Sequence, residues 1–170
     1  QEAGSSGDFY LNIYQTSSTD ADAEVQFAIA YGNKQGSGSS FYNSAVTGST
    51  PTRTIYGQYR NLILGDENSD FIFGGISSSD FWVISIDRNN YKESLLPGTM
   101  TLSLSGSNNK INLTDNSNYV NSITFNDAGR VFQLITGSQG TRTTITSRNT
   151  ADGYTTTSGS YGWLLPDIGT

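Results

Sequence analysis

The chain has 170 residues, a net charge of −6, and neither cysteine nor histidine. These features exclude a disulfide framework, a thiolate or imidazole metal site and a histidine-activated nucleophile within the sequence. The nine basic residues are scattered, whereas sequence-independent nucleic-acid binding needs a concentrated basic surface, so we expect no nucleic-acid partner. No apolar run approaches the length of a membrane-spanning helix, and we expect no membrane span.

Glycine, serine, threonine and asparagine dominate the composition, as is typical of β-rich proteins with many turns. Aromatic residues make up 12% of the chain and charged residues only 14%. This balance is too apolar and too weakly charged for a disordered coil. The composition therefore predicts a folded, β-rich chain.

The N-terminal third of the chain contains two expected strands and a long loop. Residues 9–14 alternate loosely between apolar and polar side chains, which predicts a short strand. Residues 25–31 place Val25, Phe27, Ile29 and Tyr31 on one face, which predicts a half-buried strand. The glycine- and serine-rich residues 32–51 predict a flexible loop.

Residues 52–64 are the best candidate for a helix. Apolar and tyrosine side chains recur there at helical spacing, and Thr52 or Thr54 is suited to cap the N-terminus. Gly65 follows where a C-terminal glycine is expected, although Gly57 weakens the helical pattern. The sequence therefore predicts one helix of this length.

The second half of the chain predicts mostly strands. Residues 81–86 are almost continuously apolar, which predicts a central strand covered on both faces, and residues 87–96 predict one or two helical turns. Residues 99–105 and 110–114 alternate on either side of a turn and predict a β-hairpin. Later strands are expected at residues 122–125, 130–136, 141–146 and 161–165.

Together these elements predict a mainly β fold, an antiparallel sheet or sandwich with one or two short helices. A single β-rich domain over residues 1–170 is the expected organisation, with a possible division into a loop-rich arm at 1–50 and a core at 51–170. The apolar C-terminal stretch and the absence of an initiator methionine indicate a segment of a longer polypeptide.

No constellation of catalytic or metal-binding residues stands out. Two acidic groups would be candidate calcium sites, but they lack the spacing of an EF-hand and are better interpreted as solvated turns. They are Asp20, Asp22 and Glu24, and Asp66, Glu67 and Asp70. A glycoside hydrolase would need two carboxylates about 5–9.5 Å apart, and no pair is singled out. We therefore expect no catalytic residues, no metal and no cofactor.

Four segments carry a resemblance to a known family. They are residues 23–39 (AEVQFAIAYGNKQGSGS), 54–66 (TIYGQYRNLILGD), 80–98 (DFWVISIDRNNYKESLLPG) and 161–169 (YGWLLPDIG). The chain resembles virion structural proteins of the tail or baseplate of T-even-like, contractile-tailed myoviruses, as found in marine cyanophages. The resemblance implies a structural protein without catalytic residues or cofactor, made in the host cytoplasm and located in the virion tail.

The first functional hypothesis is thus a non-enzymatic assembly module of the tail baseplate. Its partners would be other tail or baseplate subunits, in a homo-oligomer of three- or six-fold symmetry. The long loops at 32–51 and 149–160 would order against these neighbours. Candidate contact residues are Tyr56, Tyr59, Arg60, Tyr91 and Lys92, with core packing as the alternative for the two helix tyrosines.

The second hypothesis is a receptor- or carbohydrate-binding β-domain of a tail fibre. It predicts a shallow groove lined by exposed tyrosine or tryptophan with amide and carboxylate partners. A polysaccharide- or peptidoglycan-degrading domain is a third alternative.

Overall fold

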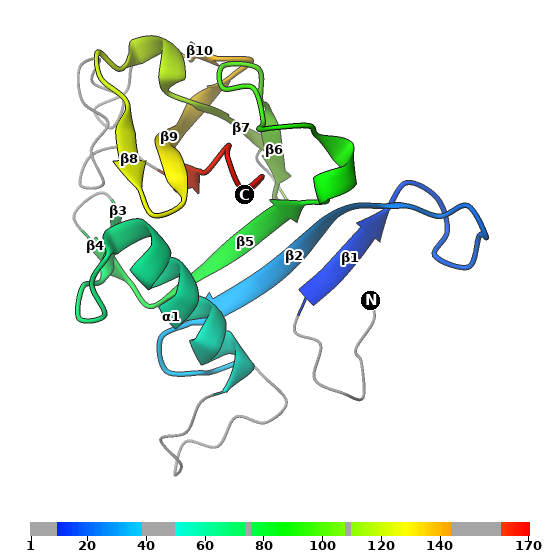
Figure 1. Ribbon diagram of the computed structural model, residues 1–170, viewed down its shortest axis with the longest axis horizontal. Coiled ribbons are helices and arrows are strands. Elements are labelled where there is room, and N and C mark those ends of the chain that lie inside the picture. The colour runs from blue at the N-terminus through cyan, green and yellow to red at the C-terminus, as the bar shows by residue number, and fades with distance from the viewer. Residues whose placement is uncertain (1–9, 39–49, 74–75, 108–109, 144–160) are drawn as a thin grey trace. The chain divides into compact units, whose positions relative to one another are not determined.

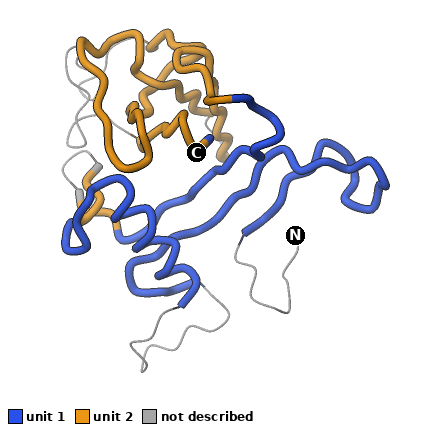
Figure 2. The backbone as a smooth tube through the Cα atoms, in the orientation of Figure 1, with its two compact units in different colours: residues 1–69, 79–92, 169–170 blue, residues 70–78, 93–168 orange. Residues whose placement is uncertain are grey.

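The computed structural model describes residues 10–38, 50–73, 76–107, 110–143 and 161–170. It confirms a mainly β fold of antiparallel sheets with one α-helix and two short 3-10 turns among the described residues (Figure 1). The chain forms two compact units, and both are discontinuous in sequence (Figure 2). Unit 1 contains residues 1–69, 79–92 and 169–170, and unit 2 contains residues 70–78 and 93–168. The chain therefore passes between the units at four points, none of them near residue 50.

Unit 1 is built on a three-stranded antiparallel sheet with the order β1-β2-β5. The strands are β1 (Tyr10–Tyr14), β2 (Val25–Asn33) and β5 (Asp80–Ile86). Both expected N-terminal strands are thus confirmed. Most of the predicted loop at 32–51 lies outside the described residues.

The predicted helix is confirmed as α1 (Pro51–Leu64). Proline at the first helical position fits because it lacks an N–H that would be unpaired there. The helix ends at Gly65, which adopts the left-handed conformation (φ 67°) and donates its N–H to the Asn61 carbonyl at 2.9 Å. The N-cap residue is Thr50, whose side chain makes no capping hydrogen bond, so the expectation that Thr52 or Thr54 caps the helix is wrong. Pro51 and Gly65 are the local signals that mark the two ends of α1.

Helix α1 packs against β2 in unit 1. Three successive positions on one face of β2, Ala28, Ala30 and Gly32, have small side chains or none, which lets a helix approach closely there. A Cβ at Gly32 would lie 2.8 Å from the Phe81 ring and 3.2 Å from the Tyr56 backbone nitrogen. Helix α1 therefore packs closely on this face of the sheet because the side chains at the contact are small.

Strand β5 was expected to be central, and this is wrong. It lies at the end of the strand order, pairs with β2, and carries the strongly exposed Trp82. Its apolar run arises because Phe81 and Val83 face one side of the sheet while Trp82 and Ile84 face the other. A continuous apolar run shows that both faces of a strand are apolar, but it does not show whether the strand is central or at the edge of its sheet.

The one or two helical turns predicted at 87–96 are reduced to a single 3-10 turn, η1 (Arg88–Asn90). The Asp87 carboxylate accepts the Asn89 N–H at 2.9 Å, and the Asn90 amide donates to the carbonyls of Val25 and Gln26. The Asp87 bond caps the start of η1, and the Asn90 bonds attach its last residue to β2. The turn ends at Tyr91, whose backbone is extended.

Unit 2 contains the remaining strands. They are β3 (Phe71–Phe73), β4 (Ile76–Ser78), β6 (Leu102–Ser105), β7 (Lys110–Asp115), β8 (Thr124–Asn126), β9 (Gly129–Ser138), β10 (Thr141–Arg142) and β11 (Trp163–Leu164). β6 and β7 confirm the predicted hairpin, and β3 pairs with β4. Strand β9 is the hub of the unit, because β7, β8, β10 and β11 all pair with it. The predicted loop at 149–160 lies outside the described residues.

The core of unit 2 combines apolar and polar side chains. Ile135, Leu165 and Phe71 are fully buried, and so is the carboxylate of Asp115. Both Asp115 oxygens accept the Gly98 N–H, at 2.8 and 2.9 Å, and one of them also accepts the Ser117 N–H. These bonds give both buried carboxyl oxygens hydrogen-bond partners and hold the 3-10 turn η2 (Ser117–Tyr119) next to β7.

Candidate functional site

The most distinctive surface of unit 1 is a group of four side chains that we call the Trp82 cluster: Tyr31, Asn33, Asp80 and Trp82. The register of β2 and β5 pairs Tyr31 with Trp82 and Asn33 with Asp80. Directly opposed residues of antiparallel strands share a face, so all four side chains lie on the same side of the sheet. The strand pairing thus places two aromatic rings beside an amide and a carboxylate.

The cluster is held together by ring contact and hydrogen bonds. The rings of Tyr31 and Trp82 lie 4.9 Å apart, centroid to centroid, at an angle of 46°. The Tyr31 hydroxyl donates to Asp80 Oδ2 at 3.1 Å, and the Asn33 amide donates to the Tyr31 hydroxyl at 3.4 Å. Trp82 nevertheless remains 70% exposed. The cluster is therefore an ordered aromatic surface with polar groups at its border.

The rest of this sheet face is apolar. Leu11, Ile29 and Ile84 form one row across the three strands, and Ile13, Phe27 and Ile86 form the next. These side chains are half-buried and lie opposite the face that α1 covers. The predicted alignment of Phe27, Ile29 and Tyr31 on one face agrees with this register.

The residues predicted from the helix as subunit contacts have different environments. Tyr56 is only 1% exposed, and its ring lies 5.3 Å from that of Phe81, so its side chain belongs to the core of unit 1. Tyr59 is half-buried, edge-on to Phe81 at 6.1 Å. The guanidinium of Arg60 lies 5.9 Å above the Tyr56 ring. Core packing, the alternative raised for the two helix tyrosines, is thus the environment of Tyr56.

The other two predicted contact residues follow β5. Tyr91 is half-buried under the guanidinium of Arg88, at 4.5 Å, and Lys92 is exposed. Within unit 1, Tyr91 also packs against Gly169, and the Tyr59 hydroxyl is hydrogen-bonded to Thr170. The structure therefore brings Tyr59 and Tyr91 to the same dipeptide, residues 169–170.

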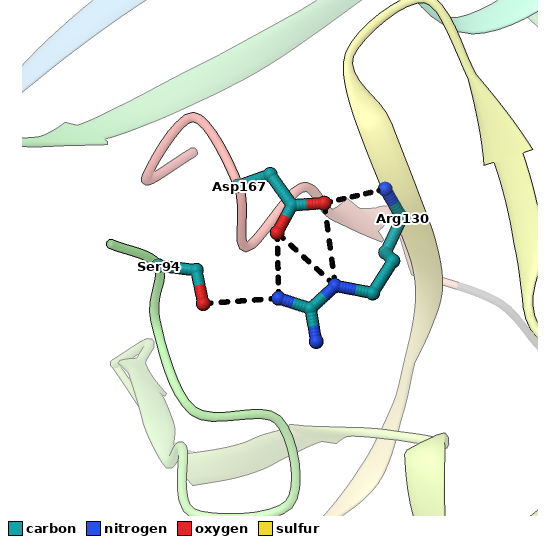
Figure 3. Close-up of polar contacts among 3 residues, drawn as sticks. All are labelled: Ser94, Arg130 and Asp167. Carbon is teal, nitrogen blue, oxygen red and sulfur yellow. Dashed lines mark hydrogen bonds and ion pairs between the residues drawn. The ribbon is translucent and has the colours of Figure 1, made fainter.

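In unit 2, Arg130 and Asp167 form an ion pair that also includes Ser94, and we call it the clamp (Figure 3). The Arg130 N–H donates to Asp167 Oδ2 at 2.7 Å, and its guanidinium donates to both carboxylate oxygens through Nε and Nη2. Nη2 also donates to the Ser94 hydroxyl at 2.9 Å. Because the serine accepts a hydrogen bond from a permanent cation, this geometry joins segments and does not activate a nucleophile.

Two carboxyl groups among the described residues have a lowered pKa. Hydrogen bonds from Arg130 lower the pKa of Asp167, and hydrogen bonds from Ser69 and Asn68 lower the pKa of Asp66. A general acid needs a raised pKa instead. Among the described residues, the acidic group with a raised pKa is the Tyr59 hydroxyl, and the main cause is burial.

The two acidic segments considered as calcium sites form turns. Asp20 accepts the Asp22 N–H at 3.2 Å, and Asp66 accepts the Asn68 N–H and the Ser69 hydroxyl. No group of three or more acidic side chains with metal-site geometry occurs in the part of the chain that the structure describes.

The strand edges of the two units differ in how they are protected. β10 contains Arg142, and at the end of β5 the Ile86 N–H donates to the Gly169 carbonyl at 2.8 Å. β1 and β6 contain neither a charged residue nor a proline, and each pairs with a single strand among the described ones. Both also expose an apolar side chain, Tyr10 in β1 and Leu104 in β6.

The sequence did not reveal the clamp or the Trp82 cluster as a unit. The sequence places Tyr31 on one face of its strand, but its pairing with Trp82 depends on the register of two strands that are separated in sequence by a helix. The clamp joins residues 37 positions apart with no motif between them. Only the number of aromatic residues was a signal that such a surface could form.

No protein-family model matches the chain, and none of the curated proteins or solved structures with which it was compared matches it either. No helix in the described ranges has the length and apolar character needed to cross a membrane.

Proposed function

We propose that the chain is a non-enzymatic assembly module of the baseplate of a contractile phage tail, in which strand edges join neighbouring subunits. The observation that carries this proposal is that β1 in unit 1 and β6 in unit 2 are the longest described strands that pair on one side only and contain neither a charged residue nor a proline. β3, β4, β8 and β11 share this composition but have at most three residues, and the β1–β2 pairing is irregular at one end, between Ile13 and Tyr14. Soluble proteins usually protect such edges with charges, prolines or bulges, because unpaired backbone groups are templates for pairing with another chain. The resemblance to virion structural proteins supplies the setting.

Two different strand edges on one chain allow copies of the chain to assemble into a closed ring. When two distinct surfaces of one chain meet head-to-tail, the contact generates a closed ring if the rotation closes. Pairing of β1 in one copy with β6 in the next would be such a contact, in keeping with the three- or six-fold symmetry expected for a tail. Main-chain hydrogen bonds would give the affinity, and the exposed Tyr10 and Leu104 would add apolar contact.

The test is the oligomeric state of the whole chain by sedimentation velocity, in wild type and in two lysine variants. Tyr10→Lys and Leu104→Lys each place a charge on one edge, and each should convert closed trimers or hexamers into monomers. Gln58→Lys adds the same charge on the exposed face of α1 and should leave the oligomer unchanged.

A mixture of the two edge variants separates the possible modes of pairing. Each variant retains the edge that the other has lost, so an equal mixture should form one-to-one dimers that cannot close a ring. If Leu104→Lys alone forms dimers, β1 pairs with itself and the ring proposal is wrong. A wild-type chain that is monomeric at every concentration would overturn the assembly role.

A further inference from the structure

Trp82 is an exposed tryptophan that the assembly proposal does not use. It lies on β5, at the opposite end of the three-strand order from β1. Isolated exposed apolar residues need no explanation, and Phe125, 68% exposed, is one example. Trp82 differs because its ring is in tilted contact with the Tyr31 ring, which has a carboxylate and an amide beside it.

The polar part of the Trp82 cluster is fixed before any ligand arrives. Asn33 Oδ1 accepts the N–H groups of Gln35 and Ser37, at 3.0 and 3.1 Å, so its amide nitrogen faces the Tyr31 hydroxyl. The Tyr31 hydroxyl in turn donates to Asp80 Oδ2. Because these groups are already held in place, little conformational entropy is lost when a ligand binds. A ligand that makes only a few contacts can therefore still bind.

The chemistry of the cluster matches a sugar ring. One face of a pyranose is apolar C–H surface, which packs on an aromatic ring, and its edge carries hydroxyls that both donate and accept. A large aromatic plane with a few placed polar groups is the usual composition of a small-molecule site. The carboxylate and the net charge of −6 disfavour anionic ligands such as uronates and nucleotides.

We propose that Tyr31, Asn33, Asp80 and Trp82 form a binding platform for a neutral glycan, with the sugar ring stacked on the indole of Trp82. Asp80 and Asn33 accept and donate hydrogen bonds at the hydroxyl edge. A single sugar unit on an open surface binds with a dissociation constant of about 1–10 mM, and a polymer gains through repeated contact.

The test follows the two indole N–H signals of the ¹⁵N-labelled chain by NMR, assigned with Trp82→Phe. The probes are glucose, galactose, mannose, N-acetylglucosamine and N-acetylgalactosamine, with glucuronate as the anionic comparison. At least one neutral sugar should shift the Trp82 signal saturably and leave the Trp163 signal in place, and glucuronate should bind more weakly.

Matched variants distinguish a specific binding site from non-specific association with an exposed aromatic side chain. Trp82→Ala should raise the dissociation constant about tenfold or more, and Asp80→Asn, which keeps the shape, should raise it several-fold. Phe125→Ala removes an aromatic ring of similar exposure in unit 2 and should have no effect. Retained melting temperatures would show that these exposed positions tolerate substitution.

Three results would overturn the proposal. One is the absence of a saturable shift with every neutral sugar, and another is equal loss of binding in the Trp82 and Phe125 variants. The third is a Trp82 signal that moves on dilution of the chain alone, since a second copy would then cover the cluster. None of these results decides whether β1 and β6 pair between subunits.

Discussion

At the scale of single residues, the Arg130–Asp167 clamp is the clearest case of one side chain joining distant parts of a unit. It connects the start of β9 to the C-terminal segment of unit 2 through a two-pronged ion pair. A Cβ at Gly129 would collide with the Asp167 carboxylate, so the neighbouring glycine is part of the same fit. The two side chains are 29% and 31% exposed, which limits the strength of the pair.

We predict that Asp167→Asn lowers the free energy of unfolding by about 1–2 kcal/mol at pH 7, because charge-assisted hydrogen bonds are lost. Urea denaturation measures this value. The folded-state pKa of Asp167 is lowered, so its stabilising contribution is complete above the unfolded value of about 3.9 and is lost as the pH falls through the folded pKa. The difference between wild type and variant should therefore shrink as the pH falls below about 4.

Asp66→Asn is the control for this experiment. Asp66 also has a lowered pKa, but it caps an exposed turn and should contribute little to stability. If the difference between wild type and Asp167→Asn persisted unchanged at pH 2, the ion pair would not be its cause.

At the scale of the elements, α1 has one glycine inside it and one at its C-terminal cap, and the two have opposite requirements. A Cβ at Gly57, inside the helix, or at Gly65, at its C-terminus, meets nothing within 4 Å. Gly65 has φ of 67°, whereas Gly57 lies within the helix proper. The two positions therefore differ in backbone conformation and not in available space.

We expect Gly57→Ala to stabilise the chain by about 0.5–1 kcal/mol, since alanine has the higher helix propensity and restricts the unfolded chain. Gly65→Ala should destabilise by about 1 kcal/mol, because an L-residue is strained in the left-handed conformation. Thermal or urea unfolding of the two variants compares them directly. A loss of stability in both would mean that Gly57 has a contact role.

The elements that the sequence predicted are those with local causes. Helix α1 and the β6–β7 hairpin were predictable because spacing, turn and terminal glycine lie within the segment itself. The position of β5 at the end of its sheet was not, since the same apolar residues serve a central strand equally well. The Trp82 cluster and the clamp needed the register of distant strands, which alternation within one strand does not determine.

At the scale of the whole molecule, the chain is two interleaved units. Phe71, in the small β3–β4 hairpin, is buried in unit 2, with its ring 5.3 Å from that of Trp163. It comes from a stretch of sequence enclosed by segments of unit 1. Neither unit therefore corresponds to one continuous piece of chain.

A split between residues 92 and 93 tests this organisation. The fragment 93–170 lacks Phe71, so we predict that it does not unfold cooperatively alone and that adding the fragment 1–92 restores a cooperative transition. Tryptophan fluorescence during urea denaturation reports on Trp163 beside Phe71. A sharp transition in the isolated 93–170 fragment would show that the β3–β4 hairpin is dispensable.

The last residues described have a consequence for how the protein forms during synthesis. Asp167 closes the clamp in unit 2, and Gly169 and Thr170 contact Ile86, Tyr91 and Tyr59 in unit 1. Chains made on the ribosome usually complete their N-terminal regions first. Here unit 2 cannot be complete until residue 168 has left the exit tunnel, and unit 1 cannot be complete until residue 170 has, so both reach their final contacts at nearly the same moment.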